Sequence, residues 1–500
     1  MARATHTTPT APMTLFPEGK CVVGVGTSPL YLELSRANRH GLIAGATGTG
    51  KTVTLQTLAE GFSAHGVPVF MADVKGDLAG IAMAGDNPKM AARAEALGIA
   101  DFTFRAFPTV FWDVFGKSGH PVRVTVSEIG PVLLARLLEL SDAQEGVLSI
   151  AFKMADDEGL LLLNLEDLQA LLAQIATDAK PLSAKYGNVS PTTVAAIQRK
   201  LLQLAQDGAE HLFGEPALDI RDLLRTDRNG QGIVNILAAD VLIQKPRVYA
   251  IFLLWLLSEL FEQLPEAGDL DQPKLVFFFD EAHLLFNDAG KPLLQKIEQV
   301  VRLIRSKGVG VYFITQQPQD IPNDVLGQLG NRVQHALRAF TPSDQKAVKA
   351  AATSFRANPD FKTEEAITTL AVGEALVSLL AADGSPSIVE RAKIRPPVSR
   401  LGPITAAERS ALLRSDSIGD TYDTPINRES AYEKLNARRA DTANTSSGKA
   451  ETTKPAAPRG RPPQGMAERI ATAAVRTATS SIGRQLGNAL MRGILGSLKR

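Results

Sequence analysis

One short segment of the chain has the residue types and the spacing that bind a polyphosphate. Its members are Gly45, Ala46, Thr47, Gly48, Thr49, Gly50, Lys51 and Thr52. They match the pattern G-x-x-x-x-G-K-[ST], in which glycines let backbone N–H groups approach the phosphates closely. Lys51 adds a positive charge beside the β- and γ-phosphates, and the Thr52 hydroxyl can ligate Mg²⁺. The segment predicts a nucleotide site in which all these residues contact ATP and Mg²⁺ is a cofactor.

A second segment places two carboxylates at the end of an apolar run. The run Leu275–Phe279 is typical of a buried strand, and Asp280 and Glu281 follow it directly. Acidic residues are rarely buried without a reason, because a buried charge is costly. We expect Asp280 to hold the Mg²⁺ ion and Glu281 to polarise the water that attacks the γ-phosphate. This division of roles predicts hydrolysis, with Lys51 and Glu281 as catalytic residues, rather than transfer to a bound substrate.

Polar residues that follow two further strand-like runs are candidates for the same site. Gln316 follows the run Gly310–Thr315 and is expected to sense the γ-phosphate and orient the water, with Gln317 as the second choice. The alternative is that Gln316 is only a turn residue before a proline. Asp73 follows the run Val67–Met71. It either faces the nucleotide across the sheet or caps the turn that comes next.

The patterns between these motifs predict how they are brought together. Continuous apolar runs such as Gly41–Ala44 are typical of parallel strands buried on both faces. Helical periodicities such as Val53–Phe62 alternate with them. The alternation predicts an α/β fold with a doubly wound, RecA-like P-loop NTPase sheet. Between residues 121 and 230 the pattern is Leu-rich and helical, which predicts a large helical insertion between two parts of one core.

We therefore expect the following organisation along the chain. The segments are an N-terminal lead-in (1–21), the first part of the ATPase core (22–120), the helical insertion (121–230), the second part of the core (231–395), a C-terminal helical segment (396–436), a linker rich in Ala, Thr, Ser, Arg and Pro (437–465) and a basic amphipathic helical extension (466–500).

The composition excludes several other classes of protein. The 500 residues are 44% hydrophobic and 21% charged, which is typical of a globular protein and not of a disordered one. The single cysteine, Cys21, excludes an internal disulfide and a cysteine-based zinc cluster. The N-terminus has no apolar segment of the signal-peptide type, and no apolar stretch reaches the ~20 residues of a membrane-spanning helix. These features predict a cytoplasmic protein.

The charge is distributed unevenly along the chain. Residues 437–500 contain 12 Lys or Arg and 3 Asp or Glu, a net charge of +9, although the whole chain carries +1. The remaining residues are therefore acidic overall. Apolar residues recur at helical spacing from Ile482 to Leu498, with basic residues between them. This tail can bind nucleic acid, an anionic membrane or a protein partner, or it is a solvated extension, and the sequence leaves the choice open.

Taken together, these motifs resemble the HerA/FtsK superfamily of ring-forming P-loop ATPases, and in particular its bacterial HerA-like proteins. The segments that carry the resemblance are GATGTGKT, MADVKGD, VFFFDEAH, FITQQPQDIP and LGNRVQHALRAFTPSDQ. They extend over roughly residues 30–435 of the chain. The resemblance implies a homo-oligomer, a hexamer, that surrounds DNA and couples ATP hydrolysis to its movement.

The same resemblance implies that active sites lie between subunits, with one subunit contributing an arginine to the γ-phosphate of its neighbour. The matching segment makes Arg338 the expected trans arginine and Arg332 the second candidate. Arg302 and Arg305 are weaker candidates, because their helical spacing suggests a solvated helix face. The chain departs from archaeal relatives in one respect. Only 44 residues precede the phosphate loop, too few for the N-terminal β-barrel that docks a nuclease, so we expect no such nuclease partner.

Two functions follow from these observations. The first is a DNA translocase or helicase-type motor, which predicts an ATPase that DNA stimulates and that depends strongly on salt. The second is an ATP-dependent oligomeric switch or scaffold whose basic tail recruits a membrane or protein partner. Such a protein would hydrolyse ATP slowly, with or without DNA. The resemblance favours the motor, whereas the acidic body of the chain offers no evident basic pore.

Overall fold

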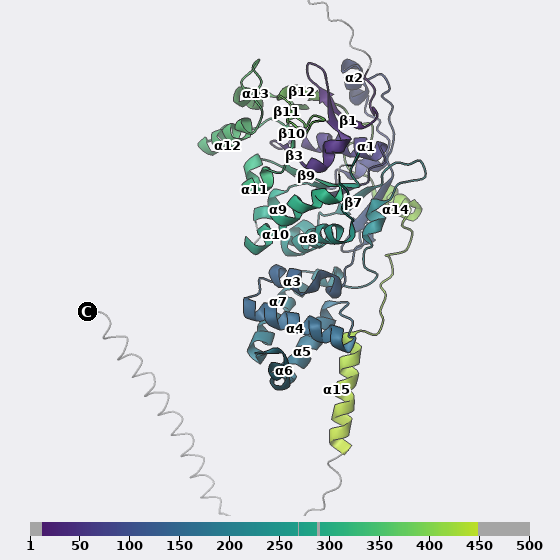
Figure 1. Cartoon of the computed structure of the whole chain (residues 1–500). Coiled ribbons are helices and arrows are strands. Elements are labelled where there is room, and N and C mark those ends of the chain that lie inside the picture. Colours follow the sequence, from purple (N-terminus) through teal and green to yellow (C-terminus); the bar gives the residue numbers. More distant parts are fainter. Residues whose placement is uncertain (1–12, 269, 288–290, 449–500) are drawn as a thin grey trace, which may run out of the picture. The chain divides into compact units, whose positions relative to one another are not determined.

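The computed structural model describes residues 13–268, 270–287 and 291–448, and within them twelve strands form one sheet (Figure 1). In the order in which they lie side by side, the strands are β2 (Pro29–Glu33), β1 (Lys20–Val25), β12 (Glu390–Ile394), β11 (Glu374–Ser378), β10 (Asn331–Gln334), β3 (Gly41–Ala44), β9 (Val309–Thr315), β8 (Leu275–Phe279), β4 (Val69–Asp73), β7 (Val234–Ala238), β5 (Thr109–Asp113) and β6 (His120–Pro121). The predicted α/β fold class is confirmed.

The part of the sheet from β10 to β6 is parallel throughout, and it contains the strands that precede the motifs. Strands β3, β9, β8 and β4 are consecutive neighbours within it. Ligands of open α/β sheets bind outside the carboxyl ends of the strands, because the segments that follow them emerge along one edge. This order therefore brings the phosphate loop, Gln316, the acidic pair and the segment after Asp73 to the same edge.

The other part of the sheet is antiparallel and was not predicted from the sequence. Strand β10 pairs with β11, β11 with β12, β12 with β1, and β1 with β2. Strand β12 does not read as a continuous apolar run, since Ala392 and Ile394 are buried but Glu390, Arg391 and Lys393 are not. The RecA-like parallel sheet thus has an antiparallel extension beside the phosphate-loop strand.

Helices cover both faces of the sheet because alternate strand residues point to opposite sides. Phe278 faces one side, where it packs with the apolar face of α1 (Lys51–Ala64), while Phe277 and Phe279 face the other. The first face also carries residues of α2 (Pro88–Ala96) and α14 (Ala406–Ser415). The second face is covered by α8 (Pro246–Gln263), α9 (His283–Asn287) and α10 (Lys291–Ile304).

In the sequence, five α-helices lie between β6 and β7. They are α3 (Val126–Leu137), α4 (Asp142–Glu158), α5 (Leu165–Thr177), α6 (Ala179–Tyr186) and α7 (Pro191–Gln206). Reciprocal capping boxes at Thr125 and Asn164 define where α3 and α5 begin. Figure 1 shows these helices gathered in one group beside α8 and α10, and their apolar residues belong to the same core as that face of the sheet.

Three shorter helices lie between β9 and β11 in the sequence. Helix α15 (Ala431–Gly448) is the last helix of the described residues. The short helices are α11 (Asn323–Leu326), α12 (Pro342–Thr353) and α13 (Thr363–Thr369). Within residues 396–436, α14 is flanked by extended and turn segments. The predicted basic helix at 466–500 and most of the predicted linker lie outside the described residues.

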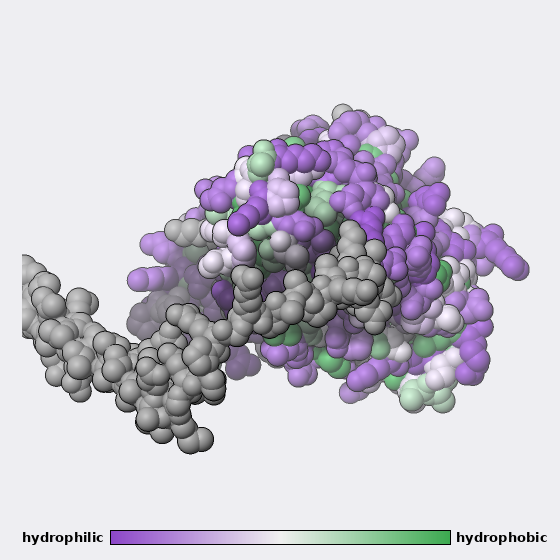
Figure 2. All heavy atoms as spheres, turned by 90° about the horizontal axis from the view of Figure 1, so that it is seen from below, coloured by the Kyte–Doolittle hydropathy of each residue, from purple (hydrophilic) through white to green (hydrophobic). Residues whose placement is uncertain are grey.

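The face of the molecule drawn in Figure 2 is mostly polar. On the face drawn in Figure 2, hydrophilic residues predominate and hydrophobic residues form small groups. None of the helices in the described part of the chain combines the length and the apolar character needed to span a lipid bilayer.

Candidate functional site

The phosphate loop connects β3 to α1, as the sequence predicts. Gly45 has φ +154° and Gly50 has φ +114°, conformations that only glycine adopts without strain. A Cβ on Gly45 would lie 2.5 Å from the Cβ of His335, so a side chain there has no room. Gly50 caps α1 without a side-chain hydrogen bond. The first N–H groups of α1 are therefore available to an anion, which the helix dipole also favours.

Lys51 folds back over this loop. Its Nζ donates hydrogen bonds to the carbonyl oxygens of Gly45 (2.6 Å) and Ala46 (3.2 Å). Burial lowers the pKa of Lys51, and the nearby charge of Glu281 opposes that shift. The ammonium group thus lies inside the loop that a phosphate would enter, and close to the acidic pair.

The acidic pair follows β8, two strands away from β3 in the sheet. Asp280 and Glu281 are both buried, and Asp280 Oδ1 accepts a hydrogen bond from the Glu281 N–H (2.9 Å). Burial, reinforced by the neighbouring Glu281, raises the pKa of Asp280 to about 7. A cation beside Asp280 would favour its charged form. The Thr52 hydroxyl and the Asp280 carboxylate are oxygen donors of the kind that Mg²⁺ prefers, so the residues present fit the predicted ion.

Glu281 has a lysine partner that the sequence analysis did not assign to the site. Lys75, in the loop after β4, places its Nζ 2.6 Å from Glu281 Oε1. Burial raises the pKa of Glu281, but the hydrogen bond and charge of Lys75 outweigh it, so the pKa lies below its usual range. His283 Nδ1 lies 3.4 Å from Glu281 Oε2. The candidate water-activating carboxylate of Glu281 is therefore ionised, and Lys75 is hydrogen-bonded to one of its two oxygens.

Asp73 forms the turn that presents Lys75. Its Oδ1 accepts from the Gly76 N–H (2.8 Å) and its Oδ2 from the Leu78 N–H (3.2 Å). Burial, with the nearby charge of Asp77, raises the pKa of Asp73 to about 6. Of the two interpretations of Asp73, the structure supports the capping role. The strand neighbours β4 and β8 then bring Lys75 to Glu281.

The candidate sensor and the candidate trans arginine are both exposed. Gln316 follows β9, which lies between the phosphate-loop strand and the acidic strand, and its side chain is exposed. Arg338 is exposed as well. In contrast, Arg332 donates to the backbone carbonyls of Leu329, Ser354 and Leu326, each at 3.0 Å. Arg332 is thus committed to its own chain, while Gln316 and Arg338 keep their predicted roles as hypotheses.

Residues at the ends of β10 and β11 contact the phosphate loop and the start of α1 through hydrogen bonds. The buried ring of His335 is hydrogen-bonded through Nε2 to Thr54 Oγ1 (2.8 Å) and through Nδ1 to the Glu374 carbonyl (3.0 Å). Burial lowers the pKa of His335 to about 4, so the ring is neutral. The Ala46 N–H donates to the Ala336 carbonyl, and the Gly373 N–H to the Thr49 carbonyl. Sequence patterns gave no sign of these contacts, because they depend on strand pairing.

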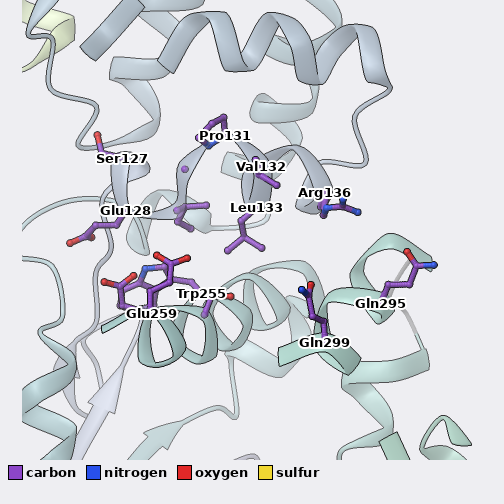
Figure 3. A pocket seen from close by; sticks show the side chains of 14 residues that line it. Ser127, Glu128, Pro131, Val132, Leu133, Arg136, Trp255, Glu259, Gln295 and Gln299 are labelled. Atoms are coloured by element: carbon purple, nitrogen blue, oxygen red, sulfur yellow. The ribbon is translucent and has the colours of Figure 1, made fainter. Parts of the chain in front are cut away.

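A cavity of about 620 Å³ lies apart from this site, between α3 and helices α8 and α10. Figure 3 shows Val132 and Leu133 of α3 on one side, and Trp255, Glu259 and Gln299 on the other. None of the phosphate-loop or acidic-pair residues lines it. The nucleotide site is therefore identified by the strand order and the loop geometry, and not by a deep cavity.

The sheet order, the phosphate loop and the acidic strand define a P-loop nucleotide-binding protein with a RecA-like core. The chain belongs to the helicase HerA-like C-terminal family, whose model matches residues 20–500. The resemblance to the HerA/FtsK superfamily is thereby confirmed. No curated protein matches the chain by sequence.

Solved structures share the fold at low sequence identity. The plasmid coupling protein TrwB in complex with a non-hydrolysable ATP analogue has a TM-score of 0.52 and 15% identity, covering 77% of this chain and 91% of that one. Unbound TrwB, a bacterial conjugative coupling protein, gives a TM-score of 0.51 with the same identity and coverage. VirB4 of Thermoanaerobacter pseudethanolicus gives 0.50 and 15% identity, covering 79% of this chain and 99% of that one.

Proposed function

We propose that this chain hydrolyses ATP with Mg²⁺ and uses the reaction to move DNA through a ring of identical subunits. The observation that carries the proposal is the environment of Glu281. This buried carboxylate keeps a pKa below its usual range and lies close enough to Lys51 for their charges to interact. An ionised carboxylate beside a phosphate loop can accept a proton from the attacking water. Membership of the HerA-like family supports the wider role.

Each residue of the site has a distinct part in this reaction. The loop N–H groups and the start of α1 bind the phosphates, and Lys51 exchanges the carbonyls of Gly45 and Ala46 for phosphate oxygens. Thr52 and Asp280 would hold Mg²⁺, whose positive charge would offset the negative charge of the phosphates. Glu281 accepts the proton of the water, and Gln316 orients that water. The oxygen of the water forms a bond to the γ-phosphorus as the bond to the bridging oxygen breaks and ADP leaves, so the result is hydrolysis.

Arg338 of a neighbouring subunit completes the proposed site. An arginine beside the γ-phosphate stabilises the charge that develops there during transfer. Two observations support a contact with another copy of the chain. Arg338 is exposed, and Phe340, two residues further on, has 81% of its surface exposed. Arginine and aromatic residues are enriched in protein interfaces, so this segment suits a subunit contact.

The experiment that tests the proposal measures steady-state ATP hydrolysis with and without double-stranded DNA, at several salt concentrations. Light scattering after size exclusion gives the oligomeric state of the same sample. Glu281→Gln is the control, since an amide cannot accept the proton, and we expect turnover to fall by about 10²-fold or more while nucleotide still binds. DNA stimulation that weakens steeply with salt, in a hexamer, is the expected result.

Two outcomes would contradict the proposal at different levels. Turnover that is unaffected by DNA would reject the motor and favour the oligomeric switch, with attention then turning to the basic residues at 437–500. Turnover that survives Glu281→Gln would reject the assignment of the base. An assembly smaller than a ring in the presence of ATP and DNA would reject the ring.

A further inference from the structure

Lys75 is the feature of the site whose role the hydrolytic scheme does not explain. Its ammonium group lies 2.6 Å from Glu281 Oε1, yet 48% of its side chain is exposed. The turn that carries it is stabilised by Asp73, which accepts the N–H groups of Gly76 and Leu78. The backbone of this loop is thus held in place, while the end of the lysine side chain is open to solvent.

Burial and an unusual backbone conformation restrict Glu281, whose carboxylate Lys75 contacts. The Glu281 side chain is 8% exposed, and its backbone has φ +48°, which is unusual for a residue other than glycine. Its second oxygen, Oε2, is buried and has no hydrogen-bond partner among the described residues. Lys75 therefore supplies the side-chain hydrogen bond that the structure shows on this carboxylate, while His283 Nδ1 lies 3.4 Å from Oε2.

Two lysines approach the same carboxylate, and they differ in freedom. Lys51 is mostly buried and bound to two loop carbonyls. Lys75 is exposed, and the charges of Lys51 and Lys75 are close enough to affect each other. A triphosphate entering the loop brings several negative charges, more than the single charge of Glu281. Of the two ammonium groups, Lys75 is the one that is hydrogen-bonded to Glu281 and can leave it for a phosphate.

We propose that Lys75 is a positioning residue that senses the terminal phosphate: it holds Glu281 when the γ-phosphate is absent and moves to the γ-phosphate when it is present. The inference rests on the proposed function, because Glu281 matters only if ATP is hydrolysed. The exchange frees Glu281 to bind the water at the moment when its substrate is in place. With ADP bound, Lys75 stays on Glu281.

The test measures the affinity of the full chain for ADP and for the non-hydrolysable analogue AMP-PNP, each with MgCl₂, by titration calorimetry. Lys75→Met removes the charge at similar length, and Lys75→Arg keeps it. Lys153→Met is the matched control, since Lys153 pairs with Asp157 at the same distance of 2.6 Å, but on the exposed side of α4. Thermal unfolding of each variant shows whether it is folded.

In Lys75→Met we expect the affinity for AMP-PNP to fall about tenfold or more, as for loss of a hydrogen bond between charged groups, and the affinity for ADP to be unchanged. Lys75→Arg should retain most of the preference for AMP-PNP, and Lys153→Met all of it. Equal changes for the two nucleotides, or no change for either, would overturn the proposal.

A second pair of variants tests the exchange itself. Glu281→Gln cannot hold Lys75 by charge, so it should bind AMP-PNP more tightly than the wild type, with ADP affinity unaltered. The double variant Lys75→Met/Glu281→Gln should lose this gain. A gain that persists in the double variant would refute the exchange. If the wild type shows the expected binding pattern but never hydrolyses ATP, the proposed function fails and the role of Lys75 as a phosphate sensor stands.

Discussion

A buried ion pair links the phosphate-loop helix to the segment that follows β12, and its removal is the sharpest test of how the loop is supported. Glu60 of α1 and Arg395 have side chains that are 0% and 1% exposed, and Nη1 of Arg395 lies 2.9 Å from Glu60 Oε2. Glu60 Oε1 also accepts the N–H groups of Val398 and Ser399. Arg395 Nε donates to the Val22 carbonyl of β1. One pair of charges thus joins three segments distant in sequence.

The perturbation is Arg395→Met, which keeps the length of the side chain and removes its charge. Glu60 would lose its hydrogen-bonded cation in the core, and breaking such a buried pair costs about 3–5 kcal/mol of unfolding free energy. Glu60→Gln/Arg395→Met removes both charges, while the amide oxygen can still accept the Val398 and Ser399 N–H groups. The double variant should therefore be more stable than Arg395→Met.

Urea unfolding followed by the fluorescence of Trp112 and Trp255 measures these differences from the transition midpoints. Arg428→Met is the surface control, because Arg428 is 53% exposed in its pair with Glu215, and such pairs contribute up to about 1 kcal/mol. A loss below about 1 kcal/mol in Arg395→Met would refute the reasoning, since an exposed pair costs as much. A double variant less stable than Arg395→Met would refute it as well.

Three further predictions concern the loop, the arginines and a buried histidine. Gly45→Ala should abolish nucleotide binding in equilibrium dialysis with little change in circular dichroism, because its Cβ would lie 2.5 Å from the His335 Cβ; binding at wild-type affinity would contradict this. Arg332→Met should lower the free energy of unfolding by about 1.5–3 kcal/mol through loss of its carbonyl contacts, whereas Arg338→Met should change it by less than about 0.5 kcal/mol and lower only turnover. Burial lowers the pKa of His120, but hydrogen bonds to Asp416 and Asp423 outweigh it and raise the pKa above 6.5. The stability that protonated His120 contributes is complete below pH 6.5 and is lost as the pH rises through the raised pKa, so the wild type should lose more stability than His120→Gln as the pH rises above 6.5; parallel curves would contradict it.

The sequence predicted those parts of the site that depend on local patterns. The strands Gly41–Ala44 and Leu275–Phe279 have the bounds expected from their apolar runs. A strand buried on both faces is apolar along its whole length, so its end is easily located. The phosphate loop has a spacing that depends on backbone geometry within a few residues. Such features are determined by neighbours in the chain and can be read from it.

The contacts that depend on strand order were not predicted. Lys75 and Glu281 are 206 positions apart and meet because β4 pairs with β8. Neither residue is unusual by itself, since exposed lysines after strands are common. The same holds for His335, which reaches Thr54 from a distance of 281 positions. Strand β12 was missed because buried and exposed residues alternate along it, and a search for continuous apolar runs does not detect alternation.

Strand β10 connects the two halves of the proposed active site. The residues that follow it, His335 and Ala336, contact the phosphate loop through the Thr54 hydroxyl and the Ala46 N–H. Two residues further along the same segment lies Arg338, the candidate for a neighbour's γ-phosphate. Because only one residue separates Ala336 from Arg338, we expect a change in the loop on nucleotide binding to shift the backbone that carries Arg338. If Arg338 acts on a neighbour's nucleotide as proposed, the occupancy of one subunit's loop would bear on the arginine that this subunit offers to the next, which is the coupling that a sequentially acting ring requires.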